Sequence, residues 1–276
     1  LKVIEIEVEE KATGEISAGA GFGTSGSTIG FGIKEKNYMG QGIKVDTNLT
    51  FSDDSVKGQL QINNPNFKNS NNALFTSISS TTTDHLADYG YKSNESSVSI
   101  GTNYERFENL FFYPTIEVNY EDLETAPKAS ANLKKQSGQY FETAFYYTLD
   151  YDKRNQRFQP SEGFRSQFTQ TIPLVSENYE LKNIYEYSKY VPFENGMVAN
   201  IIFGAGAVNG VTGNDVRISK RLYVPERKLR GFKKGKIGPI ENKDYVGGNY
   251  RSNFNLNTTL PNLFPESQNT DFRIFF

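Results

Sequence analysis

Residues 140–152 read Y-F-E-T-A-F-Y-Y-T-L-D-Y-D, and large apolar or aromatic side chains fill most of the odd-numbered positions. The even-numbered positions between them include Glu142, Asp150 and Asp152. A period of two predicts a β-strand whose faces meet different surroundings, because successive side chains point to opposite sides of a sheet. The segment is also about twice as long as an ordinary strand of roughly 5–6 residues.

The same alternation recurs along nearly the whole chain, and no segment shows the helical period of 3.6 residues. We therefore predict an all-β, antiparallel fold of about twelve strands and the start of a thirteenth. The predicted strands are residues 16–23, 29–34, 45–52, 56–63, 74–83, 97–104, 111–120, 140–152, 164–172, 179–191, 197–209, 250–260 and 271–276. Short turns are predicted at residues 25–26, 53–54 and 194–196, and longer links at residues 85–90, 123–139 and 210–244. Short turns on one side and long loops on the other are typical of outer-membrane barrels.

The composition excludes several classes of function. The chain has 276 residues with 30 basic and 32 acidic side chains, so no net field favours nucleic acid and we expect no nucleic-acid partner. Cysteine is absent from the sequence, which excludes thiolate metal sites, and we predict no metal and no cofactor. No run of about 18 apolar residues occurs, so we expect no transmembrane helix. The mean hydropathy of −0.59 is compatible with membrane strands, which are apolar on one face alone.

Alternation by itself does not separate a soluble β-sandwich from a membrane barrel. The apolar face points inward in the first and towards lipid in the second. The strands here are long, and aromatic side chains gather near strand ends, as interfacial girdles require. These aromatic residues are Tyr38, Phe51, Phe67, Phe107, Phe111, Phe112, Tyr113, Tyr187, Tyr190, Phe193 and Phe264. We therefore predict a transmembrane β-barrel.

One segment between two predicted strands has neither period. Residues 229–239 read L-R-G-F-K-K-G-K-I-G-P, with three glycines, one proline and four cations. This composition predicts a long loop. Such a loop between strands is either a disordered connector or a functional element held in place by the rest of the protein.

Six short motifs follow one another along the chain. They are V-E-E-K-A-T-G at 8–14, E-K-N-Y-M-G-Q-G at 35–42, N-N-P-N-F at 63–67, D-K-R with a later P-S-E-G at 152–163, L-R-G-F with I-G-P at 229–239, and V-G-G-N at 246–249. Each motif is weak alone. Six in this order resemble the BamA-type outer-membrane insertases, a family with POTRA domains followed by a sixteen-stranded barrel.

The resemblance implies a domain organisation. Residues 1–12 would be the end of the last POTRA domain, and residues 13–276 an incomplete barrel with about 12–13 of its 16 strands. The remaining strands would follow residue 276. They would include the last strand, which meets the first strand at a lateral seam.

The resemblance also implies that residues 229–239 belong to the sixth extracellular loop, which folds back into the lumen with Arg230 as its anchor. The motif residues are Leu229, Arg230, Gly231, Phe232, Ile237, Gly238 and Pro239. The candidate partners in the lumen are Asn257, Asp152 and Arg154. Asn257 stands where the family has an acidic residue, and a second family acid would lie beyond Phe276. We therefore expect a loop less firmly tethered than the family pattern implies, and on the residues alone a solvated basic loop stays an alternative.

The predicted first strand carries Gly19, Gly21 and Gly23. Glycine weakens a strand and exposes its backbone. One interpretation is that the glycines leave room inside a narrow barrel lumen. The other, which the resemblance supports, is a loosely paired seam strand that accepts an incoming strand at its edge. Both interpretations stay open at this point.

The function implied by the resemblance is the folding and insertion of β-barrel proteins into the bacterial outer membrane through the lateral seam. The implied partners are outer-membrane lipids, unfolded β-barrel client proteins and accessory assembly lipoproteins. A related translocation or secretion pore is the first alternative, and a diffusion porin is a less favoured one. We predict no catalytic residues and no enzyme activity, because the single histidine, His85, lies in a polar link without a catalytic pattern around it.

Overall fold

The computed structural model describes residues 9, 11–23, 26–70, 72–194, 196–225, 228–233, 235–260 and 273–275. The strands of its main sheet are β1 (Gly14–Gly23), β2 (Gly26–Tyr38), β3 (Ile43–Ser52), β4 (Ser55–Asn64), β5 (Ala73–His85), β6 (Tyr91–Phe107), β7 (Leu110–Thr125), β8 (Gly138–Asp152), β9 (Gly163–Ser176), β10 (Glu180–Pro192), β11 (Val198–Gly210), β14 (Tyr250–Thr259) and β15 (Arg273–Phe275). The minor elements are η1 (Phe67–Asn69), α1 (Ala131–Lys134), η2 (Ile218–Lys220), β12 (Ile240–Glu241) and β13 (Asp244–Tyr245). The all-β prediction is confirmed.

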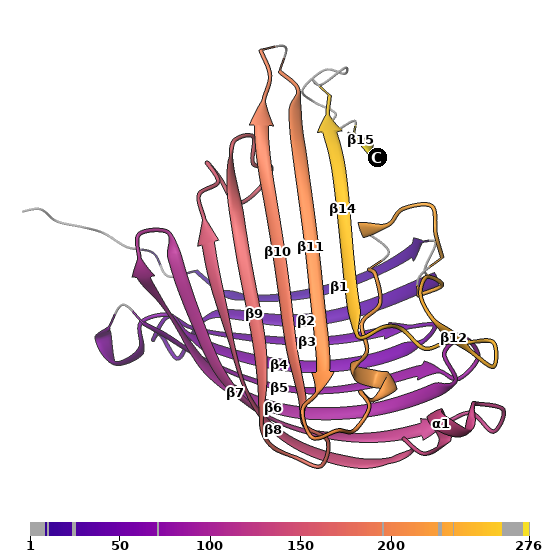
Figure 1. Ribbon diagram of the computed structural model, residues 1–276. Coiled ribbons are helices and arrows are strands. Elements are labelled where there is room, and N and C mark those ends of the chain that lie inside the picture. The colour runs from indigo at the N-terminus through magenta and orange to yellow at the C-terminus, as the bar shows by residue number, and fades with distance from the viewer. Residues whose placement is uncertain are drawn as a thin grey trace, which may run out of the picture.

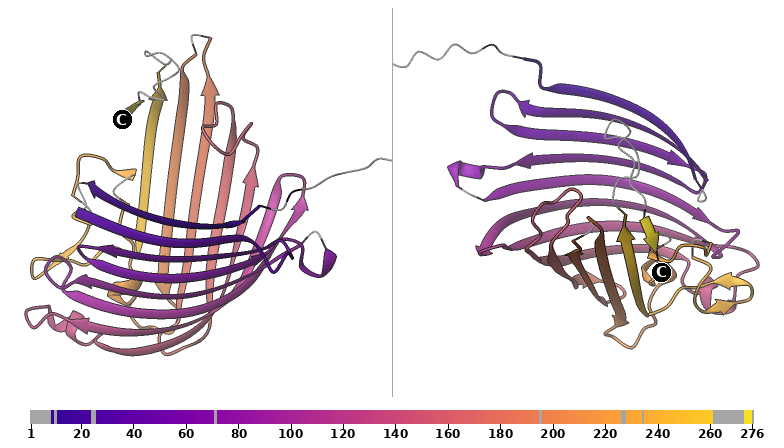
Figure 2. Two further views of the ribbon diagram at one scale, coloured as in Figure 1. Left: turned by 180° about the vertical axis from the view of Figure 1, so that it is seen from behind. Right: turned by 90° about the horizontal axis from the view of Figure 1, so that it is seen from above.

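The thirteen strands form one antiparallel sheet in the order β1 to β11, then β14 and β15. Each strand pairs with its neighbours in the chain, and the β12–β13 hairpin stands apart. The sheet curls strongly, so that β1–β6 run across the direction of β9–β14 (Figure 1). The view from above in Figure 2 shows the same curl, with the concave face enclosed between the two halves. Within the described residues the sheet has two edges, β1 and β15. The predicted antiparallel, incomplete barrel is therefore confirmed.

The two faces of the sheet differ as the alternation predicts. Apolar side chains on the convex face are exposed, as Phe31 is at 51%, Ile116 at 46% and Phe141 at 48%. Their neighbours on the concave face include polar side chains that are buried, such as Glu142 and Asp150. Such a surface is stable where lipid covers the convex face and water or protein fills the concave side.

The connections do not separate into a short-turn side and a long-loop side. In this up-and-down sheet the connections alternate between its two ends. The short β1–β2 and β3–β4 connections therefore lie at the same end as the long β7–β8 and β11–β14 connections. The start of β2 is joined to the β3–β4 turn, because the Ser27 N–H donates to Asp53 Oδ2 at 3.2 Å and its hydroxyl to Oδ1 at 2.5 Å. The prediction that loop length divides the two ends was wrong on this point.

We call residues 211–249, the connection between β11 and β14, loop six, and its end of the sheet the loop-six end. The buried apolar core lies there, on the concave face. It unites the β5–β6 connection, β6, β7, the α1 region and loop six. Its buried members are Tyr89, Tyr91, Leu123, Ala129, Leu133, Ile218 and Val246. A membrane barrel has no continuous interior core of its own, so loop six and α1 supply one at this end.

The α1 turn is held against loop six by its cap. The Ser130 hydroxyl accepts a hydrogen bond from the Leu133 N–H at 3.2 Å, which caps the helix. It also donates to the Glu241 carboxylate of loop six at 2.8 Å. In the part of the chain that the structure describes, no helix has the length and apolar character needed to span a membrane.

The predicted POTRA strand lies outside the described residues, apart from Glu9 and the segment from Lys11 onward. The first strand of the sheet begins at Gly14. The assignment of residues 1–12 to a POTRA domain therefore stays a prediction.

Candidate functional site

Loop six runs back over the concave face of the sheet before it reaches β14. We call residues 211–225 the first limb of loop six and residues 228–249 its second limb. The first limb contains the η2 turn, the second contains the β12–β13 hairpin, and an isolated bridge between Leu222 and Gly248 joins the two limbs. Hydrogen bonds of 2.8 and 2.9 Å join the two bridge residues in both directions. The two limbs of the loop are therefore hydrogen-bonded to each other, and the loop also lies on the concave face of the sheet.

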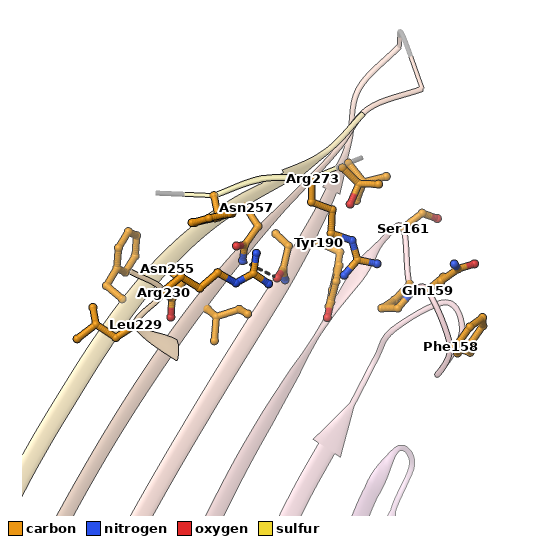
Figure 3. A pocket seen from close by; sticks show the side chains of 16 residues that line it. Phe158, Gln159, Ser161, Tyr190, Leu229, Arg230, Asn255, Asn257 and Arg273 are labelled. Carbon is orange, nitrogen blue, oxygen red and sulfur yellow. Dashed lines mark hydrogen bonds between the residues drawn. The ribbon is translucent and has the colours of Figure 1, made fainter. Parts of the chain in front are cut away.

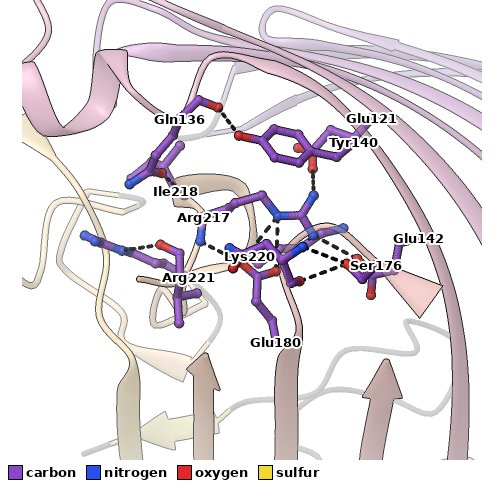
Figure 4. A network of polar contacts seen from close by, with 12 residues as sticks. Glu121, Gln136, Tyr140, Glu142, Ser176, Glu180, Arg217, Ile218, Lys220 and Arg221 are labelled. Carbon is purple, nitrogen blue, oxygen red and sulfur yellow. Dashed lines mark hydrogen bonds and ion pairs between the residues drawn. The ribbon is translucent and has the colours of Figure 1, made fainter. Parts of the chain in front are cut away.

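A deeply buried polar contact joins loop six to three strands. Arg217 is 2% exposed, and its guanidinium lies against three carboxylates (Figure 4). Its Nη1 is 3.1 Å from Glu121 of β7, and its Nη2 is 2.8 Å from Glu142 of β8 and 2.9 Å from Glu180 of β10. Burial acts to lower the pKa of Arg217, but the hydrogen bond and charge of Glu180, with Glu121 and Glu142, raise it overall. The guanidinium is therefore charged, as ion pairing with carboxylates requires.

Further groups complete this cluster. Ser93 donates to Glu121 at 3.0 Å, and the Asn178 amide donates to Glu180 at 2.9 Å. The Tyr140 ring lies 4.5 Å from Arg217 Cζ, in the geometry of a cation–π contact. These contacts supply hydrogen bonds to carboxylates that the guanidinium does not fully satisfy, which is the condition for burying such charges.

Three lysines give loop six additional contacts along its length. Lys220 lies 3.2 Å from Glu95 of β6, and Lys228 lies 3.3 Å from Glu186 of β10. Lys236 pairs with Asp88 in the β5–β6 connection, and its ammonium also lies 4.6 Å from the Tyr245 ring centre. The expectation of weak tethering concerned residues 229–239 and stays a prediction. Ahead of that segment, the Arg217 cluster holds loop six through buried charges that the sequence analysis did not predict.

Arg230, the anchor predicted from the resemblance, is exposed and lines a cavity of about 520 Å³ at the opposite end of the concave face (Figure 3). Asn255 and Asn257 line the same cavity, and the Arg230 guanidinium lies 4.5 Å from the Phe275 ring centre. Asn257 donates to Asn200 at 3.4 Å rather than to the loop. Among the described residues, Arg230 forms no ion pair with a carboxylate.

The other candidate partners of Arg230 pair with each other. Arg154 donates to both oxygens of Asp152, at 2.8 and 2.7 Å. Among the described residues, the ion pair of Asp152 is therefore with Arg154 and not with Arg230. Arg154 and Arg230 instead line one cavity together with Arg165.

The remaining motif residues shape the second limb of loop six. Leu229 lines the Arg230 cavity, and Phe232 is 57% exposed. Gly231 has a φ of 86°, a conformation that favours glycine. Gly238 likewise has a φ of 127°, Ile237 is partly buried, and the Pro239 carbonyl accepts from the Val246 N–H at 3.0 Å.

The predicted seam strand is β1, at the edge of the sheet. Every described position from Gly14 to Phe22 is exposed. A Cβ added at Gly19 or Gly21 would meet no atom within 4 Å, so lack of space does not explain these glycines. Gly23 ends the strand.

The Arg217 cluster is the feature that sequence reasoning missed. Glu121, Glu142 and Glu180 all fall on the polar positions of their strands near the loop-six end. Three inward carboxylates near one end of nearby strands in the same sheet indicate a buried cation. The sequence offered many loop cations, and nothing in it distinguished Arg217 from the others.

These features define a class: an antiparallel membrane β-barrel whose longest loop is docked inside it. Residues 37–276 match the Omp85 superfamily domain, and the chain belongs to this superfamily. It is similar to the outer membrane protein assembly factor BamA of Neorickettsia risticii (strain Illinois), with 22% identity over 258 residues. That match covers 90% of this chain and 34% of the relative, so the chain spans about a third of the relative's length.

Solved structures show the same fold. The crystal structure of BamA from Haemophilus ducreyi lacking POTRA domains 1–3 matches with a TM-score of 0.85 and 22% identity, covering 97% of this chain and 57% of that chain. CdiB from Acinetobacter baumannii matches with a TM-score of 0.54 and 11% identity, covering 94% of this chain and 47% of that one. The predicted resemblance to BamA-type barrels is confirmed, and the chain forms part of an outer-membrane β-barrel.

Proposed function

We propose that the chain is the barrel part of an outer-membrane protein insertase, which folds β-barrel proteins and inserts them through a seam beside β1. The observation that carries the proposal is the make-up of β1, which has β2 as its one partner among the described strands, is exposed along its described length and carries glycines where side chains would fit. An edge with free backbone groups and little packing is a template for strand addition. The name of the similar Neorickettsia protein, an outer membrane protein assembly factor, supports the same function.

The proposed partners follow from this mechanism. Extended strands of unfolded β-barrel clients would pair with β1, and outer-membrane lipids would surround the apolar convex face. Accessory assembly lipoproteins would act on the periplasmic side, where residues 1–12 would join a POTRA domain. Strand exchange requires no covalent step, so we propose no enzyme activity.

The test uses the full-length protein in vesicles of outer-membrane lipids. Folding of an added β-barrel client is followed by its shift in electrophoretic mobility without heating. We expect faster client folding than in empty vesicles, and several-fold slower folding with Gly19→Val and Gly21→Val together, because β-branched residues stabilise the strand.

The matched control is Gly30→Val in β2, where a Cβ also meets open space but the strand is paired on both sides. No acceleration by the parent protein would contradict the proposal. Steady ion conductance without client folding would favour the diffusion-porin alternative instead.

A further inference from the structure

We propose that Arg217 is the positioning residue that docks loop six in the barrel, and that Glu121, Glu142 and Glu180 form a receptor for its guanidinium. This inference concerns loop docking and goes beyond the insertase function. It assigns the fixed point of the loop to its first limb, rather than to the L-R-G-F motif around Arg230.

The receptor is built by three strands rather than by one flexible segment. Glu121 is 0% exposed, Glu180 is 4% exposed and Glu142 is 9% exposed, so water does not screen their charges. Carboxylates held together in this way repel one another and are costly to bury without a cation. The concave face of β7, β8 and β10, which we call the wall, therefore favours a docked loop six that supplies a cation to these carboxylates.

The geometry fits a guanidinium and not an ammonium group. Arg217 Nε lies 3.3 and 3.2 Å from the two Glu180 oxygens, while Nη1 reaches Glu121 and Nη2 reaches Glu142 and Glu180 (Figure 4). A planar fork of five donors can serve three carboxylates in different directions, whereas an ammonium is a single point charge. The stacked Tyr140 ring also suits a flat cation.

The backbone around Arg217 is docked with the side chain. Its own N–H donates to Glu180 at 2.7 Å, and the next N–H, of Ile218, donates to the Gln136 side chain at 2.8 Å. Val216 and Ile218 on either side are 1% and 0% exposed. The three consecutive residues 216–218 are therefore all buried against the concave face of the sheet, in contrast to the exposed Arg230.

Cysteine labelling tests this inference directly, since the chain has no cysteine of its own. Val216→Cys in the full-length protein, with cysteines elsewhere removed, places a buried thiol beside Arg217. In lipid vesicles we expect slow alkylation of this thiol, about 100-fold faster alkylation with Arg217→Met, and little protection with Arg217→Lys. Lys228→Met is the matched control, because Lys228 pairs with the partly exposed Glu186 and should leave the labelling rate within about threefold of the parent.

A charge rescue separates docking from general folding. Arg217→Met combined with Glu121→Gln, Glu142→Gln and Glu180→Gln removes the repulsion and should return alkylation towards the parent rate. Retention of mobility-shifted, folded barrel is checked in each variant. Slow labelling of Arg217→Met would overturn the proposal, as would labelling of the rescued variant as fast as that of Arg217→Met, or failure of both to fold.

Client folding is measured on the same samples as a separate readout. If labelling changes as expected and client folding does not, the docking role of Arg217 is supported, and docking of loop six is not needed for the proposed function. If the parent protein fails to fold clients at all, the insertase proposal fails while the labelling result still decides the anchor.

Discussion

Strands β1 and β7 belong to one sheet but occupy opposite physical states. The described positions of β1 are exposed on both faces, whereas β7 buries Thr115, Asn119, Glu121 and Leu123. Strand β7 pairs on both sides and carries loop six on its concave face, while β1 has β2 as its one partner among the described strands. The same alternating pattern therefore yields a fixed wall in one place and a loosely held edge in the other.

The difference arises from what the inward positions carry. On β1 and β2 they are mostly small, with Gly19, Gly21 and Gly30 facing open space. On β7, β8 and β10 they include carboxylates that require a cation from loop six. Backbone pairing is common to both regions, so the side chains on the concave face decide which strands are held in place.

The largest expected effect comes from breaking the fixed wall at Glu180. Glu180→Ala removes the acceptor of both the backbone and the side chain of Arg217, and should lower the free energy of unfolding by about 3–5 kcal/mol. Urea unfolding in detergent micelles measures it. Glu186→Ala is the control, because its single pair with Lys228 is partly exposed and should cost at most about 1 kcal/mol. Equal losses for the two variants would remove the distinction between buried and peripheral contacts.

An intermediate effect is expected from adding one methyl group to each region. A Cβ at Gly101 of β6 would crowd the Phe75 ring, Thr115 Oγ1 and the Pro114 carbonyl, which lies 2.8 Å away. Gly101→Ala should therefore lower the free energy of unfolding by about 1–3 kcal/mol. Gly21→Ala in β1 should leave it unchanged or raise it slightly, because it restricts the unfolded chain without a clash. The contrast would be broken if thermal unfolding showed Gly21→Ala to be the more damaging change.

The smallest effect is expected at the periphery of loop six. Asp88→Asn removes the partner of Lys236, but leaves the Tyr245 ring 4.6 Å from the ammonium. Since Asp88 is largely exposed, the change should cost at most about 1 kcal/mol and vanish in high salt. Alkylation of the Val216→Cys thiol measures whether the first limb stays docked. A rate as fast as that of Arg217→Met would show that the loop depends on its second limb instead.

Most of the fold could be predicted from the sequence, because a period of two over long segments specifies strands and their faces. The segment at 140–152 had its polar face assigned correctly, and Glu142 and Asp150 do face inward. What alternation could not give was the end of the sheet at which each connection lies, because turn length and turn position are independent. The β1–β2 and β3–β4 connections show this, since they are short but lie at the same end of the sheet as the long loops.

The site was predicted only in part, for a physical reason. The motif around Arg230 has a local signature in glycine and proline, which a single sequence displays. The receptor for Arg217 is assembled from residues up to 96 positions away in the chain. Such a cluster depends on the register of three strands and on the path of the loop, and neither is fixed by local composition.

Amide hydrogen exchange of the full-length protein in lipid, resolved by strand, tests the central claim most directly. The claim is that a wall held by the Arg217 cluster coexists with a weakly held edge at β1. We predict the slowest exchange in β7, β8 and β10, and exchange in β1 that is faster and unaffected by Glu180→Ala. Protection of β1 equal to that of β7, or a change in β1 as large as that in β7 on Glu180→Ala, would contradict it.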